Sequence, residues 1–168
     1  DTGIGPSSRA AALSGEQARS ALLAHRAMAL IKALKLPATP RTPTPGSGRP
    51  GVVLTTSGPG LLNAAAAAAT SWAESRPVLL LSPGAPAGTE GADLGQLHET
   101  KDSSGALDRI VAWSRRVSSP EAAADAVAAA FAGFAAGRPR PVHVEIPLDV
   151  LEAPWSGGAP GPSAVSSQ

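Results

Sequence analysis

The sequence contains no cysteine and no tyrosine, and aromatic residues make up only 3% of its 168 residues. The absence of cysteine excludes disulfide bonds and thiolate metal sites. Much of the hydrophobic fraction of 43% is alanine, so the apolar area that each residue can bury is modest. We therefore expect a domain of low stability on its own.

Charged residues are also scarce. They make up 16% of the chain, the formal net charge is +1, and no basic cluster is interleaved with aromatic residues. This pattern predicts no nucleic-acid partner. No apolar run approaches the thickness of a bilayer and no signal-peptide pattern opens the chain, so we expect a cytoplasmic protein without a membrane segment. The start at Asp1 rather than methionine indicates a fragment or a trimmed product.

The N-terminal third divides into three parts. Residues 1–13 are small and polar, and we expect them to be disordered. Residues 14–36 are predicted to form a helix, because Ser14 and Gln17 have the spacing of a capping box and apolar residues follow along one face. Residues 37–50 are rich in proline and predict an extended insertion.

The rest of the chain alternates strand and helix patterns up to a tail rich in proline, glycine and serine. The tail, residues 153–168, is expected to be a linker or a disordered segment, which leaves one domain over residues 14–152. The pattern predicts strands over residues 52–55, 78–82, 110–117 and 142–146, helices over 61–74 and 120–136, and a long loop over 83–108. Such alternation predicts an α/β fold of three layers, with a mostly parallel sheet flanked by helices.

The second of these helices has clear end signals. Ser119 is the expected N-cap, a proline occupies the first turn, and Gly137 ends the helix. Its predicted core face consists of Val127, Phe131 and Phe134.

A glycine turn, residues 56–60 (Thr-Ser-Gly-Pro-Gly), joins the first strand directly to an alanine-rich helix. Open α/β sheets bind ligands at such a strand end, where backbone N–H groups and a helix N-terminus converge. The turn lacks the lysine of a phosphate loop, Asn63 stands where a dinucleotide fingerprint has its third glycine, and no GxSxG elbow is present. The two glycines alone would also permit a tight turn. A generic nucleotide-binding module therefore stays open as an alternative.

Five segments taken in order resemble one family: TTSGPGLLN, RPVLLLSPG, GQLHETKD, WSRRV and GRPRPVHVEIPLDVL. They are similar to the N-terminal, pyrimidine-binding domain of thiamine-diphosphate-dependent enzymes, and most of all to the acetolactate synthase group. The resemblance covers residues 51–151. The chain lacks the first strand and loop of the full domain, so the fold is expected to be incomplete at its N-terminus.

The resemblance implies a cofactor held between two domains, usually from different subunits of a homo-oligomer. This domain would hold the aminopyrimidine ring of thiamine diphosphate. A diphosphate-binding domain, absent from this chain, would hold the other end together with Mg²⁺. The implied activity is decarboxylation or carboligation of 2-oxo acids, with the isolated chain inactive.

Site residues are carried over from the family motifs. The resemblance implies that the crevice is lined by Thr56, Ser57, Gly58, Pro59 and Gly60, with Asn63 capping the helix behind it. Leu97 and His98 stand where the family has Phe-Gln, also near the cofactor. His98 would handle a substrate proton, although a solvated loop histidine is an equal alternative. His98, Glu99 and Asp102 lack the spacing of a metal site, so no metal ligand is predicted.

The activating glutamate of the family matches Glu16, at the start of the predicted first helix. That carboxyl group would hydrogen-bond the pyrimidine ring and favour its imino tautomer. If His25 and Arg26 occupy that place instead, the carboxylate is replaced by a cation. The chain would then be a degenerate, non-catalytic interaction module.

The last predicted strand carries two polar residues on one face. His143 and Glu145 alternate with Val142, Val144 and Ile146, so the polar and apolar sets point to opposite sides of the sheet. We expect the polar pair to be structural, hydrogen-bonded within the sheet or at a subunit contact.

Overall fold

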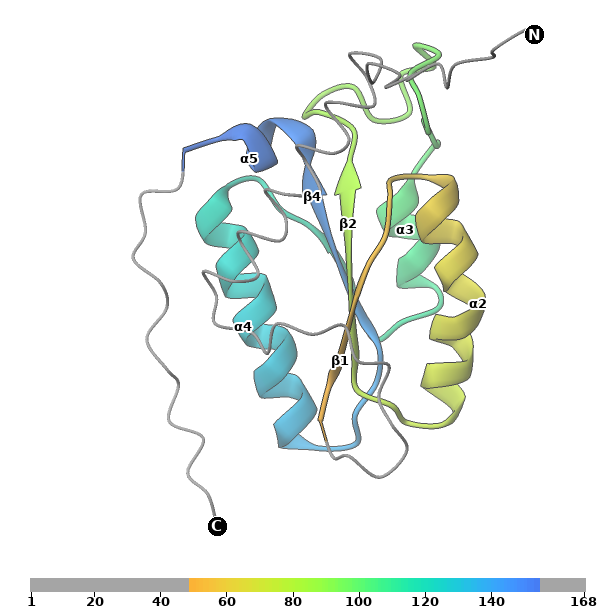
Figure 1. Ribbon diagram of the computed structural model, residues 1–168, viewed down its shortest axis with the longest axis vertical. Helices are drawn as coiled ribbons and strands as arrows, with labels where there is room; N and C mark the ends of the chain where they lie inside the picture. The colour runs from red at the N-terminus through yellow and green to blue at the C-terminus, as the bar shows by residue number, and fades with distance from the viewer. Residues whose placement is uncertain (1–48, 155–168) are drawn as a thin grey trace, which may run out of the picture.

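The computed structural model describes residues 49–154, drawn in colour in Figure 1. The predictions for residues 1–36, for most of the proline-rich insertion and for the tail beyond residue 154 lie outside this range. Within the described residues, no helix is long and apolar enough to cross a bilayer.

Four strands form a parallel sheet in the order β1-β2-β4-β3. The strands are β1 (Gly51–Leu54), β2 (Val78–Gly84), β3 (Ser114–Arg116) and β4 (Val142–Pro147). The helices are α2 (Pro59–Ala73), α3 (Ser103–Asp108), α4 (Pro120–Ala136) and α5 (Leu148–Glu152). Figure 1 shows α4 on one face of the sheet and α2 with α3 on the other. The predicted three-layer α/β fold is confirmed.

Strand β2 lies at the centre of two hydrophobic clusters, one on each face of the sheet. Leu79 and Leu81 belong to the cluster under α4, whereas Val78 and Leu80 belong to the cluster under α2 and α3. The alternation follows from the two-residue period of a strand. Because both faces are covered, this strand reads as a continuous apolar run.

The loop predicted over residues 83–108 is shorter than expected at both ends. Strand β2 continues to Gly84, and α3 occupies residues 103–108. Helix α3 begins where the Asp102 side chain accepts a hydrogen bond from the backbone N–H of Gly105 at 2.7 Å. A six-residue helix with glycine at its third position has too little apolar periodicity to be predicted from pattern alone.

The strand predicted over residues 110–117 is shorter than expected, with only Ser114–Arg116 in the sheet. The backbone N–H groups of Ile110 and Val111 both donate to the carbonyl of Leu107, which closes a turn at the end of α3. These two apolar residues pack under the helix instead of extending the strand.

Helix α4 begins and ends as predicted. The hydroxyl of Ser119 accepts a hydrogen bond from the backbone N–H of Ala122 at 3.1 Å, and Gly137 is the C-cap. Its core face differs in part. Val127 is buried, but Phe131 and Phe134 are half-buried and meet edge to face at the margin of the core, with ring centroids 5.8 Å apart. The small residues Ala123, Ala126 and Ala130 lie against the sheet instead.

We predict that Ser119→Ala lowers the free energy of unfolding by about 1 kcal/mol, because the N–H of Ala122 loses its capping acceptor. Urea denaturation measures the change. Ser118→Ala is the matched control, since Ser118 is exposed and precedes the cap. It should change stability by less than about 0.5 kcal/mol. Equal effects of the two substitutions would contradict the capping role.

Candidate functional site

A hollow lies at the edge of the sheet where β1, β2 and β4 have their carboxyl ends. Its empty space, part of it open to solvent, is about 480 Å³. The lining residues are Ser57, Gly58, Gly84, Ala85, Glu90, Gln96, Leu97, His98, Glu99, Thr100, Asp102, Ser103, Glu145 and Leu148. This edge is where open parallel sheets bind ligands.

The turn after β1 and the loop before α3 are in direct contact. Gly58 has φ +52°, and a Cβ placed on it would lie 2.1 Å from the carbonyl oxygen of His98. Only glycine therefore allows both this backbone conformation and this close approach. The contact places two motifs that lie 40 residues apart in the sequence at one side of the hollow.

The structure brings together four of the residues predicted for the site: Ser57, Gly58, Leu97 and His98 all line the hollow. The other predicted turn residues, Thr56, Pro59 and Gly60, belong to the same turn or the first turn of α2 but are not part of this lining. Glu16 lies outside the described residues.

The predicted capping role of Asn63 is wrong. The N-cap of α2 is Gly58, and no side chain caps this helix. Asn63 lies inside the helix, four residues after Pro59, and is exposed. Since the helix begins as soon as the turn ends, the capping position falls on the glycine.

The loop that carries Leu97 and His98 is held by the carboxylate of Glu99. This carboxylate accepts hydrogen bonds from the backbone N–H groups of Leu94 at 3.0 Å and Gln96 at 2.9 Å. These bonds hold the pKa of Glu99 below its ordinary value. His98 is exposed and has φ +60°, and Leu97 is 58% exposed, so both side chains lie at the protein surface.

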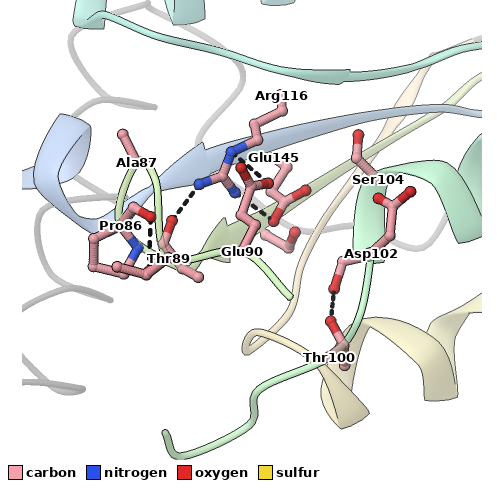
Figure 2. A network of polar contacts seen from close by, with 12 residues as sticks. Pro86, Ala87, Thr89, Glu90, Thr100, Asp102, Ser104, Arg116 and Glu145 are labelled. Carbon is pink, nitrogen blue, oxygen red and sulfur yellow. Dashed lines mark hydrogen bonds and ion pairs between the residues drawn. The ribbon is translucent and has the colours of Figure 1, made fainter. Parts of the chain in front are cut away.

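A partly buried ion-pair cluster lies at the end of the hollow near β4. Glu145 is 4% exposed, and its Oε1 accepts a hydrogen bond from Nη1 of Arg116 at 2.9 Å. The same guanidinium lies 2.6 Å from Oε1 of Glu90 through its Nε, and it donates to the carbonyl of Ala85. Figure 2 shows the Arg116 guanidinium next to the carboxylates of Glu90 and Glu145.

The second carboxylate oxygen of Glu145, Oε2, is buried and has no hydrogen-bond partner within residues 49–154. Burial raises the pKa of Glu145, and the neighbouring Arg116 opposes that rise. The cluster therefore keeps an acceptor that is removed from water and still unpaired.

Gly84 makes room for this ion pair. A Cβ on Gly84 would lie 2.3 Å from Oε1 of Glu145 and 2.5 Å from Nη1 of Arg116. This pair is not predicted from the sequence, although both residues lie in segments that carry the family resemblance. The signal that would have revealed the pair is the register of the sheet, because Arg116 of β3 lies directly opposite Glu145 of β4.

His143 is fully buried and joins three strands. Its Nε2 and the hydroxyl of Ser82 are 2.9 Å apart, and its Nδ1 lies 2.7 Å from the hydroxyl of Ser114. Burial lowers the pKa of His143 to about 4, so the ring is neutral at pH 7. The expectation that His143 and Glu145 are hydrogen-bonded within the sheet is confirmed. His143 does not line the hollow.

In the described part of the chain, no group of three or more histidine, aspartate or glutamate side chains is placed to hold a metal ion. The carboxylates at the hollow instead hold backbone N–H groups or the guanidinium of Arg116.

Comparison with known proteins identifies relatives of this chain. The family described as thiamine pyrophosphate enzyme, N-terminal TPP binding domain, matches residues 45–106. The probable 2-ketoarginine decarboxylase AruI of Pseudomonas aeruginosa is 44% identical over 114 residues, which cover 66% of this chain and 20% of the relative.

Two acetolactate synthases are similar as well. The probable acetolactate synthase large subunit of Methanocaldococcus jannaschii is 36% identical over 63% of this chain and 17% of its own length. The mitochondrial acetolactate synthase catalytic subunit of Saccharomyces cerevisiae is 36% identical over 64% of this chain and 15% of its own length. The matched region thus spans a fifth or less of these relatives.

Proposed function

We propose that this chain supplies the pyrimidine-binding half of a cofactor site. The premise is that residues 45–106 match the N-terminal TPP binding domain of the thiamine pyrophosphate enzymes. The enzyme it serves would act on 2-oxo acids. The observation that carries the proposal is the contact of Gly58 with the carbonyl of His98, because it joins two family motifs at one hollow.

The residues at the hollow fit the ring end of the cofactor. An aminopyrimidine is flat, with apolar faces and a polar edge that both donates and accepts hydrogen bonds. Leu97 and Leu148 offer apolar contact, while Ser57 and His98 offer donors and acceptors. In addition, the hydroxyl of Thr55, at the end of β1, is buried without a partner among the described residues.

The same residues do not fit the diphosphate end. Four carboxylates line the hollow, from Glu90, Glu99, Asp102 and Glu145, and no lysine or arginine of residues 49–154 does so. An anionic diphosphate would be repelled there. We therefore assign the diphosphate and its Mg²⁺ to a separate domain or subunit, which makes the working enzyme an oligomer or a multidomain protein.

When bound, thiamine diphosphate supplies an electron sink for cleavage of the bond next to the carbonyl group of a 2-oxo acid. The chain itself would orient the ring between the turn after β1 and the loop of residues 96–99. His98, with its imidazole at the surface of the hollow, would hold or accept a substrate proton. Glu16 would hydrogen-bond a ring nitrogen and favour the imino tautomer.

The reaction we propose is decarboxylation, with or without subsequent carboligation. One relative is named as a decarboxylase of a 2-oxo acid, 2-ketoarginine, and two others are named as synthases of acetolactate. These names support the proposed reaction. A cytoplasmic location is part of the proposal.

Complementation tests this function. The chain is mixed with a separately produced diphosphate-binding domain of an acetolactate synthase, thiamine diphosphate and Mg²⁺, and release of CO₂ from a panel of 2-oxo acids is followed. We expect turnover in the mixture and none from either part alone. Glu16→Gln should reduce the restored rate at least roughly 100-fold, the scale of a lost acid–base group.

Glu121→Gln is the control for this experiment, because Glu121 is an exposed carboxylate on α4 away from the hollow. Its rate should equal that of the unmodified chain. Cofactor binding by the mixture, measured by calorimetry, gives a second readout. Binding without turnover on any 2-oxo acid would instead favour a non-catalytic interaction module.

A further inference from the structure

The part of the hollow next to β4 is strongly acidic. Strands β2 and β4 are neighbours in the sheet, and Gly84 at the end of β2 lies against the side chain of Glu145. The loop after β2 brings Glu90 to the same part of the hollow. Arg116 contacts both carboxylates but is not part of the lining. Lys101 is exposed and also stands outside the lining. The surface that a ligand would meet is therefore negative.

Three of the four carboxylates already have defined partners within the protein. Glu99 accepts from the backbone N–H groups of its own loop, Asp102 accepts from Gly105 at the start of α3, and Glu90 pairs with Arg116. Their charges remain at the hollow, but their hydrogen bonds serve the local structure.

Glu145 differs from the other three. Its side chain is 4% exposed and lines the hollow, and only Oε1 is paired with Arg116. The other oxygen, Oε2, has no partner in the described structure. An unpaired carboxylate oxygen that has lost its water is destabilising, and a charged donor brought by a ligand would remove that penalty. A neutral donor would do so less well, since hydrogen bonds to an ionised donor are about twice as strong.

We propose that this acidic end of the hollow, formed by Glu90 and Glu145, binds the cationic end of a substrate side chain, a guanidinium or ammonium group, with Oε2 of Glu145 as the acceptor. The statement that the cation belongs to a substrate rests on the proposed function. The substrate class is then a 2-oxo acid with a positively charged side chain. An anionic side chain would be repelled, and an apolar one would leave Oε2 unpaired.

The test of this cation site uses probes that contain neither a 2-oxo acid group nor a thiamine ring. Propylguanidinium and its uncharged counterpart propylurea are titrated separately into the full ¹⁵N-labelled 168-residue chain, and amide shifts are followed by NMR. We expect propylguanidinium to shift the amides of Gly84, Glu90 and Glu145. Propylurea should bind roughly tenfold more weakly, which corresponds to one charge-assisted hydrogen bond.

Variants locate the site. Glu145→Gln should weaken binding of propylguanidinium roughly tenfold, and Glu90→Gln, a change at a side chain that is 42% exposed, should weaken it to a smaller degree without risk to the core. Asp125→Asn removes the same charge from an exposed position on α4 and should leave binding unchanged.

Equal binding of the two probes, no measurable binding of propylguanidinium, or equal effects of Glu90→Gln and Asp125→Asn would each overturn the cation site. Since the probes do not involve the cofactor, such a result would leave the proposed function to the complementation experiment. Failure of complementation with retained selectivity for propylguanidinium would instead reject the proposed function and keep the cation site.

Discussion

Lowering the pH from 7 to 5 is expected to remove about 2 kcal/mol of stability through His143 alone. Well above pH 6.5, its ordinary pKa, the ring is neutral in both the folded and the unfolded chain, so it contributes no pH dependence there. Below pH 6.5 the unfolded chain takes up a proton, whereas burial keeps the folded ring neutral down to a pKa of about 4. Stability therefore falls as the pH falls through this window.

Urea denaturation at half-unit steps between pH 7 and pH 5 measures this slope. His143→Gln is the comparison, because glutamine can still hydrogen-bond Ser82 and Ser114 but does not titrate. The variant will be less stable at pH 7 but should lose about 2 kcal/mol less on acidification. Parallel curves for the two proteins would show that His143 takes up its proton in the folded state, against the burial seen here.

Gly58→Ala should lower the free energy of unfolding by about 3 kcal/mol. The substitution puts a Cβ on a residue with φ +52° and ψ −113°, a sparsely populated backbone conformation that costs about 1 to 3 kcal/mol, and it drives that Cβ into the carbonyl of His98. Urea denaturation gives the total. The backbone amide shifts of residues 96–99 should also change, because the loop must move away from the turn.

Gly88→Ala separates the two causes. Gly88 has φ +79°, and a Cβ there would meet nothing within 4 Å, so only the backbone strain applies. Its loss should be about 1 kcal/mol. If Gly58→Ala and Gly88→Ala destabilise the protein equally, the turn after β1 and the loop of His98 are not in the close contact on which the hollow depends.

The parts of the fold that the sequence predicts correctly are those with strong local signals. Strand β2 has a continuous apolar run, and α4 has both an N-cap and a terminal glycine. Helix α3 is not predicted by the sequence, and strand β3 is shorter than predicted, because tertiary packing decides both. Ile110 and Val111 have the composition of a strand but fold under α3.

The predictions for the site succeed and fail for the same reasons. Its turn and its loop follow from family motifs, and the structure places Ser57, Gly58, Leu97 and His98 together. The acidic end does not follow from any motif, because the pairing of Arg116 with Glu145 depends on the register of two strands. The role given to Asn63 failed because the helix begins five residues earlier in the chain than a cap at that position requires.

A crystal structure of this chain reconstituted with a diphosphate-binding domain and thiamine diphosphate provides the most direct test. We predict density for the aminopyrimidine ring against Ser57 and Gly58, with the loop of Leu97 and His98 on its other side. A fully occupied diphosphate site with the ring bound elsewhere, and the hollow of this chain empty, would contradict the assignment.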